Sequence, residues 1–485
     1  MVTASWRDGV VYQIYPRSFQ DSNGDGVGDL RGVTSRLDHL ERLDVDALWL
    51  SPFYPSPGAD FGYDVSCYTD VDPLLGSLDD FDELVAGAHE RGLRVLLDLV
   101  PCHTSIEHPW FRKHPGRYIW ADASGRPPNN WTSAFGGSAW SLDEKSGRLY
   151  MHSFYPEQPD LDWHDPEVPR AIGDVLRFWL DRGADGFRLD AIDRLVKDPA
   201  LRDDPPSEEP FGLPLLPHEL GRDLCNSRNA AGTDRALAAL REAAGDAFLV
   251  GEVYLPTSKY RPFLDQLDRA FVFELLMSAW ESDALGHVIE VAAALEGRRG
   301  AGAAWVLSNH DFGRLSSRYG PENERAAAVM LLTLPGTAFI YQGDEIGMVN
   351  GPGGTPPRDR VGRDSFRHPM QWDGSPGGGF TRGTPWLPLV DPDERNVADQ
   401  SGRGGSLLEL FRALIAIRRG LGHGFRMLES TPGVLAYERG EHVVAINLAG
   451  EERPAPGGEI ALATHGLDGA RSGTLAAHGA VICRP

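Results

Sequence analysis

Three acidic side chains stand at the ends of short apolar runs, where a charge adds nothing to packing. They are Asp190, Glu252 and Asp311, which close the segments 187–190, 248–252 and 308–311. A carboxylate can act as a nucleophile, and a protonated carboxyl group can give its proton to a departing oxygen. If these side chains meet in the fold, they can carry out a displacement with acid–base assistance.

Apolar runs of this kind indicate buried parallel strands, and here they alternate with helical stretches. The alternation predicts a (β/α)8 TIM barrel, in which catalytic groups converge at the carboxyl ends of the strands. The first helix is expected where Leu30, Val33, Leu37, Leu40 and Leu43 recur at intervals of three and four. The eight expected strands are 10–15, 47–50, 95–99, 186–190, 248–252, 270–275, 304–308 and 339–341.

The long stretch after the third strand interrupts this pattern. It is rich in Pro, Gly, Trp and Asn, and a structureless loop of that size is unusual in a compact domain. A second excursion, 201–229, follows the fourth strand and is expected to shape the mouth of the site. We therefore expect a catalytic barrel in two parts, 1–103 and 169–420, with an inserted small domain at 104–168, a last barrel helix at 407–419 and a C-terminal antiparallel β-domain at 421–485.

Bulk composition narrows the choice of partners and compartment. The 485 residues carry a net charge of -23, which disfavours nucleic acid or an anionic membrane as a partner. The four cysteines lack close or metal-ligand spacing, which favours a reducing cytoplasm over a disulfide-built secreted protein. We see no signal-peptide pattern and no apolar run near the ~20 residues that span a bilayer. We expect a cytoplasmic monomer or small homo-oligomer.

The segments around the three acids resemble those of the α-amylase family (glycoside hydrolase family 13). They read Gly-Phe-Arg-Leu-Asp-Ala, Gly-Glu-Val and Asn-His-Asp, in that order along the chain. The resemblance implies that Asp190 is the nucleophile, Glu252 the general acid/base, and Asp311 a ligand of sugar hydroxyls. Arg188, two residues before Asp190 on the same strand face, is expected to keep that acid ionised. Taken alone, an Arg-x-Asp would more often be a surface ion pair, and a lone Gly-Glu or His-Asp would be a weaker signal still.

Further matches to the family imply a closed sugar pocket. By this resemblance Tyr63 stacks on the terminal glucose and Asp60 takes its 4- and 6-hydroxyls. Because a buried aspartate needs a partner, Arg367 is expected to pair with Asp60. A pocket closed in this way accepts chain ends and so implies exo-acting cleavage. The remaining substrate contacts implied by the resemblance are the histidines His103 and His310 and the aromatic walls Phe135 and Phe154.

Two short segments bear on the branch of the family. Gln158-Pro-Asp-Leu-Asp162 is close to the Gln-Pro-Asp-Leu-Asn signature of the oligosaccharide α-glucosidase branch, with Asp162 in place of Asn. In 98–103, Cys102 replaces a usual Asn and is expected to be a small buried hydrophobe. Ala191, which follows the nucleophile, accompanies α-1,4 preference in this branch, whereas valine accompanies α-1,6.

The segment 21–29 places oxygens at alternate positions around a glycine turn, like the first nine positions of a calcium loop. Gly32 at the twelfth position excludes a true EF-hand, which needs a glutamate there. The resemblance implies a structural Ca2+ or Mg2+ site and no organic cofactor. The alternative is a turn that caps the helix beginning near Leu30. The implied ligands are Asp21, Asn23, Asp25, the Val27 carbonyl and Asp29.

Together these observations predict a retaining, exo-acting α-glucosidase that releases α-glucose from small oligosaccharides or disaccharides, with α-1,4 substrates favoured. One alternative is a transglucosylase or sucrose or maltose isomerase that uses the same glucosyl-enzyme intermediate. Another is an inactive homologue that serves as a binding subunit, although the three acids disfavour it.

Overall fold

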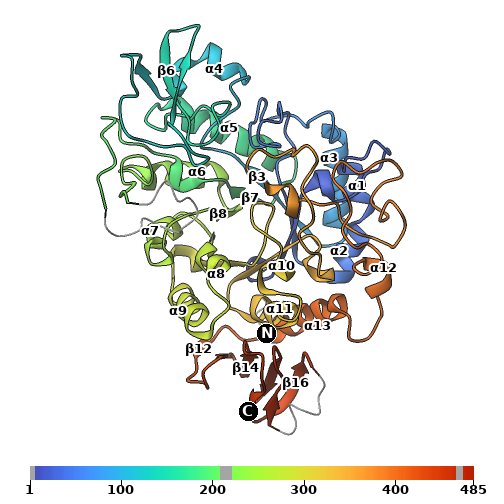
Figure 1. Cartoon of the computed structure of the whole chain (residues 1–485). Helices are drawn as coiled ribbons and strands as arrows, with labels where there is room; N and C mark the ends of the chain where they lie inside the picture. Colours follow the sequence, from blue (N-terminus) through green and yellow to red (C-terminus); the bar gives the residue numbers. More distant parts are fainter. Residues whose placement is uncertain (1–5, 208–220, 466–472, 485) are drawn as a thin grey trace.

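A closed barrel of eight parallel strands forms the centre of the molecule in the computed structural model, which describes residues 6–207, 221–465 and 473–484 (Figure 1). The strands follow one another around the barrel in the order β1, β2, β3, β7, β8, β9, β10 and β11, and β11 closes onto β1. The fold class expected from the sequence is confirmed. The barrel strands are β1 (Val10–Ile14), β2 (Ala47–Leu50), β3 (Arg94–Leu99), β7 (Gly186–Leu189), β8 (Phe248–Gly251), β9 (Arg269–Phe271), β10 (Gly302–Val306) and β11 (Thr337–Tyr341).

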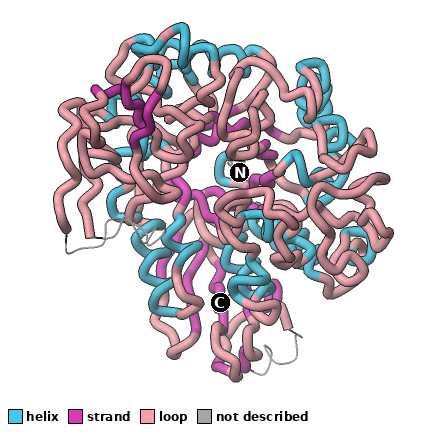
Figure 2. Tube along the Cα trace, turned by 45° about the horizontal axis from the view of Figure 1, so that its top comes forward, coloured by secondary structure: helices cyan, strands magenta, loops and turns pink. Residues whose placement is uncertain are grey.

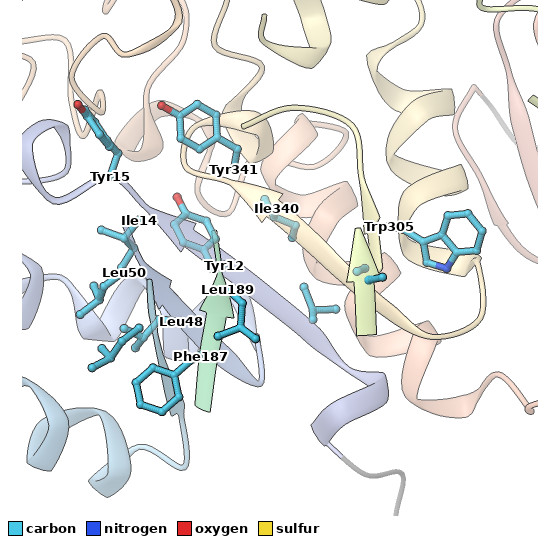
Figure 3. Packing of buried hydrophobic residues seen from close by; sticks show 14 of the residues in the cluster. Tyr12, Ile14, Tyr15, Leu48, Leu50, Phe187, Leu189, Trp305, Ile340 and Tyr341 are labelled. Atoms are coloured by element: carbon cyan, nitrogen blue, oxygen red, sulfur yellow. The ribbon is translucent and has the colours of Figure 1, made fainter. Parts of the chain in front are cut away.

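Strand alternation divides the barrel side chains into two layers. Ile14, Leu50 and Leu189 belong to the large cluster of buried residues that packs outside the strands against the helices (Figure 3). The intervening residues form a second cluster that fills the barrel, with Trp49, Phe271 and Phe339 in mutual ring contact. Other members of the inner cluster are Val11, Ala47, Leu96, Phe248, Val250, Ala304 and Val306.

The helices cover the outside of the barrel. The five leucine and valine side chains of the first expected helix are all buried, but they lie on two helices that break at Arg36 (φ -111°, ψ 7°). The last barrel helix, α13, begins at Leu407 as expected. The helices are α1 (Leu30–Ser35), α2 (Leu37–Leu43), α3 (Leu78–Glu90), α4 (Pro109–Lys113), α5 (Glu167–Asp181), α6 (Thr233–Ala244), α7 (Arg261–Leu264), α8 (Phe273–Met277), α9 (Ser282–Ala293), α10 (Leu315–Tyr319), α11 (Glu324–Thr333), α12 (Val397–Gln400) and α13 (Leu407–Gly420).

The prediction of a strand at 270–275 is wrong for the second half of that range. The strand β9 ends at Phe271, and α8 begins at Phe273. A short apolar run has the same appearance in a buried strand and in a buried helix turn, so periodicity alone cannot place this boundary. Phe273 still stacks on Phe271, with ring centroids 5.6 Å apart, and so extends the inner cluster beyond the carboxyl end of β9.

Within the described ranges, three smaller sheets lie outside the barrel, and the smallest is the strand pair β15-β17. A three-stranded antiparallel sheet, within 104–168, lies beside α4 at the top of Figure 1, and the five-stranded sheet β12-β13-β14-β18-β16 lies at the opposite end. Much of the chain around the barrel is loop (Figure 2). No described helix has the length and apolar character needed to cross a membrane. The outer strands are β4 (Trp120–Asp122), β5 (Trp140–Asp143), β6 (Arg148–Met151), β12 (Phe425–Met427), β13 (Val434–Arg439), β14 (His442–Asn447), β15 (Arg453–Pro454), β16 (Glu459–Ala463), β17 (Thr474–Leu475) and β18 (Ala480–Arg484).

Candidate active site at the carboxyl ends of the strands

One guanidinium group contacts two of the three predicted acids. Arg188 Nη1 donates to Asp190 Oδ1 over 2.6 Å, and Arg188 Nη2 lies 2.6 Å from Glu252 Oε1. Both acids directly follow their strands, β7 and β8, and both are at least nine-tenths buried. The two carboxyl groups therefore lie close together on one side of the barrel mouth, facing the same positive charge.

Asp98 is a third acid on the same arginine, and the sequence analysis assigned it no role. Its Oδ1 accepts a 2.8 Å bond from Arg188 Nη1, and its Oδ2 accepts bonds from Trp49 Nε1 (3.2 Å) and Tyr63 Oη (3.0 Å). It is opposite Arg188 in the β3–β7 register. Leu96 points into the barrel, and side chains two residues apart on a strand share a face. This pattern could have placed Asp98 inside the barrel as well.

This crowding of acids changes their protonation. Burial, with Glu252 acting in the same direction and Arg188 against it, raises the pKa of Asp98 to about 7. Burial and the neighbouring acids also raise the pKa of Asp190 well above its ordinary value. Arg188 lowers the pKa of Asp190, as expected, but burial outweighs it, and the neighbouring acids act in the same direction as burial.

The raised pKa of Asp98 predicts a pH-dependent stability. Between the unfolded pKa of about 3.9 and the folded value of about 7, the folded state binds a proton that the unfolded state does not. This contribution is therefore fully present below the unfolded pKa and is lost as the pH rises through the folded pKa. We expect the free energy of unfolding of Asp98→Asn to change less between about pH 5 and about pH 8 than that of the wild type, as measured by urea unfolding. If the free energy of unfolding changed equally with pH in both proteins, the raised pKa would not belong to Asp98.

Asp311 lies in the turn after β10 and has a different set of partners. Its Oδ1 accepts from Arg363 Nη1 (2.9 Å) and Arg367 Nη2 (3.0 Å), and its Oδ2 lies 3.0 Å from His310 Nε2. Burial would raise its pKa, but His310 and the two arginines outweigh it and hold the pKa of Asp311 well below its ordinary value. Asp311 is therefore the permanently ionised acid of the group.

His310 connects Asp311 to the barrel interior. Its Nδ1 lies 2.7 Å from the amide nitrogen of Gln13, which can only donate, so the proton of the neutral ring belongs on Nε2. That Nε2 lies 2.7 Å from Tyr63 Oη as well as close to Asp311. Burial lowers the pKa of His310 and favours the neutral ring. His310 and Tyr63, both predicted substrate contacts, are thus brought together beside Asp311.

The predicted pairing of Asp60 with Arg367 is wrong, because Arg363 takes that place. Arg363 Nη2 contacts Asp60 Oδ1 while Nη1 reaches Asp311. Asp359 fixes this orientation by accepting from Arg363 Nε (3.1 Å) and Nη2 (2.7 Å). Arg367 instead donates its Nε to the His310 carbonyl over 2.8 Å. Two arginines four residues apart cannot be told apart from sequence, since the choice depends on the turn that carries them.

Gln158 links Asp60 to His103. Its amide nitrogen donates to Asp60 Oδ2 over 3.0 Å and lies 3.0 Å from His103 Nε2. His103 Nε2 is also 3.1 Å from the Tyr63 carbonyl oxygen. All four side chains are buried, and burial lowers the pKa of His103. The sequence pattern predicts Gln158 as part of the branch signature and predicts no contact for it.

The two predicted aromatic walls lie together. The ring centroids of Phe135 and Phe154 are 5.5 Å apart, and Phe154 packs edge-on against His103 at 5.2 Å. The Arg363 guanidinium lies over Phe135, 5.5 Å from its centroid. Both rings come from the inserted stretch, so this segment supplies one side of the site.

Cys102 is buried, as expected for a small apolar replacement. Its Sγ lies 3.6 Å from Lys197 Nζ, and the Lys197 ammonium also donates to Asp160 and to the Arg194 carbonyl. Burial strongly raises the pKa of the thiol. Cys102, His103 and Asp160 are the one group of metal-type side chains gathered within 4.8 Å in the described part of the chain, but the ammonium already supplies a cation there. Asp162, the other departure from the family pattern, accepts from His164 N in a turn.

The predicted metal segment 21–29 forms a tight loop that caps α1. Asp21 accepts from the backbone of Asn23 (3.0 Å), Gly24 (2.7 Å) and Gly26 (2.8 Å). Asp29 Oδ1 accepts from Gly32 N over 2.7 Å, which is the capping contact offered as the alternative. Asn23 Oδ1, both Asp25 oxygens and Asp29 Oδ1 accept one bond each and retain a second lone pair that suits a hard divalent cation. Both oxygens of Asp21 already accept two bonds each, so a cation there would have to displace part of the capping pattern.

The excursion 201–229 is described only at its two ends, because 208–220 lie outside the described residues. Its described part packs on the inserted stretch. Trp131 Nε1 donates to the Arg202 carbonyl over 2.9 Å, and Asn130 donates to Asp203 and Asp204. Its predicted role at the mouth of the site stays a prediction.

Comparison with known proteins gives a consistent picture. Residues 13–422 match the alpha amylase catalytic-domain family. A probable alpha-glucosidase of Rhizobium meliloti (strain 1021) is 41% identical over 464 residues, covering 85% of this chain and 82% of that protein. The oligo-1,6-glucosidase of Parageobacillus thermoglucosidasius is 36% identical, covering 93% and 91%. A crystal structure of an alpha-glucosyl transfer enzyme, XgtA, aligns with a TM-score of 0.89 at 35% identity, covering 99% of each chain.

Proposed function

The chain belongs to the α-amylase family and is a glycoside hydrolase, and from this premise we propose that it is a retaining, exo-acting α-glucosidase. It releases α-glucose from the non-reducing ends of short α-glucosides. The observation that carries the proposal is the Arg188 guanidinium, which holds the carboxyl groups of Asp190 and Glu252 close together. Retaining glycosidases need such closeness, roughly 5–5.5 Å between the two groups, whereas inverting enzymes leave room for a water.

Double displacement follows from this arrangement. Asp190 attacks C1 of the terminal glucose while Glu252 protonates the departing oxygen, which gives a glucosyl ester of Asp190. Glu252, now ionised, takes a proton from water, which attacks C1 and releases α-glucose. Asp190 attacks in its ionised form, which Arg188 favours against the burial that raises the pKa of Asp190. Asp311 binds sugar hydroxyls and strengthens its hold in the transition state.

Exo action follows from the closed end of the pocket. Asp60, Arg363 and Gln158 form a charged and hydrogen-bonded wall, which Arg363 joins to Asp311. Its carboxylate and amide groups suit the outer hydroxyls of a terminal glucose and leave no passage for a continuing chain. We propose that Asp60, Tyr63, His103, His310, Phe135 and Phe154 line this glucose site.

The preference for α-1,4 linkage rests on Ala191. Its backbone lies in the left-handed region (φ 47°), and its N–H donates to Glu252 Oε2 over 2.9 Å. A β-branched residue is disfavoured in this conformation, whereas alanine fits and leaves room beside the acid/base. A difference of this size changes discrimination by ~1–3 kcal/mol, so the preference is graded.

The direct test follows the products by proton NMR. We expect α-glucose as the first-formed anomer and faster release from maltose than from isomaltose. First-formed β-glucose would contradict retention, and equal or reversed rates would contradict the linkage preference. No turnover of maltose or of a chromogenic α-glucoside would favour the inactive binding subunit instead.

A transglucosylase is the second candidate, and the match to an α-glucosyl transfer enzyme supports it. Both activities use the same glucosyl ester, so the acids cannot separate them. Incubation with concentrated maltose or sucrose does: hydrolysis yields only the component monosaccharides, whereas transfer yields new glucosides and isomerisation yields rearranged disaccharides.

We also propose a structural Ca2+ or Mg2+ in the 21–29 loop, away from the acids. The oxygens of Asp21, Asn23, Asp25, Asp29 and the Val27 carbonyl would hold it. Chelation is expected to lower the melting temperature, and added Ca2+ or Mg2+ to restore it. Asp25→Asn should weaken that response while leaving the capping residue Asp29 intact. A melting temperature unaffected by chelator would leave the loop as a helix cap alone.

A cytoplasmic location is proposed as well. All four cysteines are free, as a reducing compartment favours. Cell fractionation tests this, and recovery of the protein outside the cytoplasm would contradict it.

A further inference from the structure

Tyr254, two residues after Glu252, has a contact that the mechanism above does not use. Its hydroxyl donates to Glu252 Oε1 over 2.9 Å. Two other donors face the same carboxyl group: Arg188 Nη2 at Oε1 and the Ala191 N–H at Oε2. Arg188 lies on β7 and Ala191 directly follows the nucleophile, whereas Tyr254 is the one of these three donors that comes from the Glu252 segment itself.

A stack of aromatic rings fixes the Tyr254 hydroxyl in place. The Tyr254 ring lies parallel to Phe273, with centroids 4.8 Å apart and planes 7° from parallel. Phe273 in turn stacks on Phe312 at 5.8 Å, and Phe312 directly follows Asp311. The backbone carbonyl of Tyr254 also accepts from Arg228 Nη2 over 2.9 Å. The stack therefore links the segment of the acid/base to the segment of the sugar-binding acid.

We propose that Tyr254 is a positioning residue for Glu252, which fixes the orientation of the carboxyl group by holding Oε1 and favours the ionised carboxylate through its hydroxyl bond. The inference rests on the proposed acid/base role of Glu252. Burial raises the pKa of Tyr254 well above its ordinary value, so the hydroxyl keeps its proton and remains a donor. The charged groups that face Glu252 are Arg188 on β7, Asp190 directly after that strand, and Asp98 on β3. The acids around Tyr254 are Asp311 and Asp193.

The test is Tyr254→Phe, which removes the hydroxyl and keeps the stacked ring. Loss of a donor makes the ionised carboxylate less stable, so the acid form persists to higher pH. The basic limb of kcat/KM against pH, which reports the free enzyme's essential acid, is expected to move upward by about one pH unit. Turnover of maltose should fall more than turnover of an aryl α-glucoside, whose leaving group needs less protonation.

Tyr260→Phe is the matched control, because it removes another buried hydroxyl from the same loop. That hydroxyl donates to the carbonyls of Val253 and Phe271, not to a carboxylate. We expect a lower melting temperature and unchanged pH limbs. If Tyr254→Phe behaves like this control, or only raises KM, the proposal is wrong.

A second variant covers the case in which Tyr254→Phe fails to fold. Phe273→Leu keeps the hydroxyl but loosens its support, so a smaller shift of the basic limb in the same direction is expected, and no shift would overturn the proposal. Failure of the acid/base assignment is recognised separately: Glu252→Gln would then keep near-normal turnover, whatever the pH profile of the tyrosine variant.

Discussion

Asp190→Asn and Glu252→Gln are each expected to lower turnover of maltose by about ten-thousandfold or more, with the fold intact. The first change removes the nucleophile that forms the glucosyl ester, and the second removes the only group proposed to move a proton at the departing oxygen. Both replacements preserve size. Circular dichroism and thermal unfolding should therefore resemble the wild type, and near-normal turnover of either variant would refute the role assigned to that residue.

Azide separates the two roles. In Glu252→Ala, azide needs no general base and can attack the glucosyl ester from the face that water would use, so we expect restored turnover and α-glucosyl azide. In Asp190→Ala, azide can take the place of the missing nucleophile and should give β-glucosyl azide. If Glu252→Ala gave β-glucosyl azide and Asp190→Ala gave α-glucosyl azide, the roles of nucleophile and acid/base would have to be exchanged.

Arg363→Gln is expected to lower kcat/KM about 100- to 1,000-fold. Arg363 contacts both Asp60 and Asp311, so its loss leaves two carboxylates facing each other without the charge between them. Removing one partner of a buried, hydrogen-bonded charge pair costs about 2–5 kcal/mol, or about 30- to 5,000-fold, and the expected loss lies within that range. Arg363→Lys should recover only part of the loss, because a single ammonium cannot bridge two carboxylates as a planar guanidinium does. Steady-state kinetics with maltose measures both variants.

Arg360→Gln is the control for this change. Arg360 lies three residues earlier, is about half exposed, and pairs with Glu157 on the surface. A surface pair of this kind contributes little, so kcat/KM should stay near the wild-type value. If Arg360→Gln and Arg363→Gln have equal effects, the loop as a whole matters and the specific bridge between Asp60 and Asp311 does not.

The barrel could be predicted because its strands are local features of the sequence. Alternation within Gly186–Leu189 and Phe248–Gly251 directs Arg188, Asp190 and Glu252 to the same side, and parallel strands bring their carboxyl ends together. The strand limit at Phe271 was misplaced because an apolar run carries no mark of where strand becomes helix.

The wall of the sugar pocket could be predicted only in part. Asp60 was recognised, but its partner lies 303 residues away, and two arginines in the same segment were equally eligible. Their difference arises from Asp359, which turns Arg363 toward the pocket. Such a choice depends on tertiary contacts that no local pattern encodes.

Asp98 and Tyr254 were missed for a related reason. Each is an ordinary residue in its own segment, and each gains its role from a neighbour on another part of the site. Asp98 shares Arg188 with two other acids, and Tyr254 depends on the stack with Phe273. Arg188 acts on the pKa of Asp190 in the expected direction, but burial, which no local pattern encodes, outweighs it.

The most direct test of the central claim is to trap the covalent intermediate. A fluorinated α-glucosyl donor that forms the ester quickly and hydrolyses slowly should label the wild-type enzyme with one glucosyl group. Peptide mass spectrometry is expected to place that group on Asp190 and to find none in the Asp190→Asn variant. A label on Glu252, Asp311 or another residue, or turnover of maltose with no covalent label under any condition, would contradict the proposed mechanism.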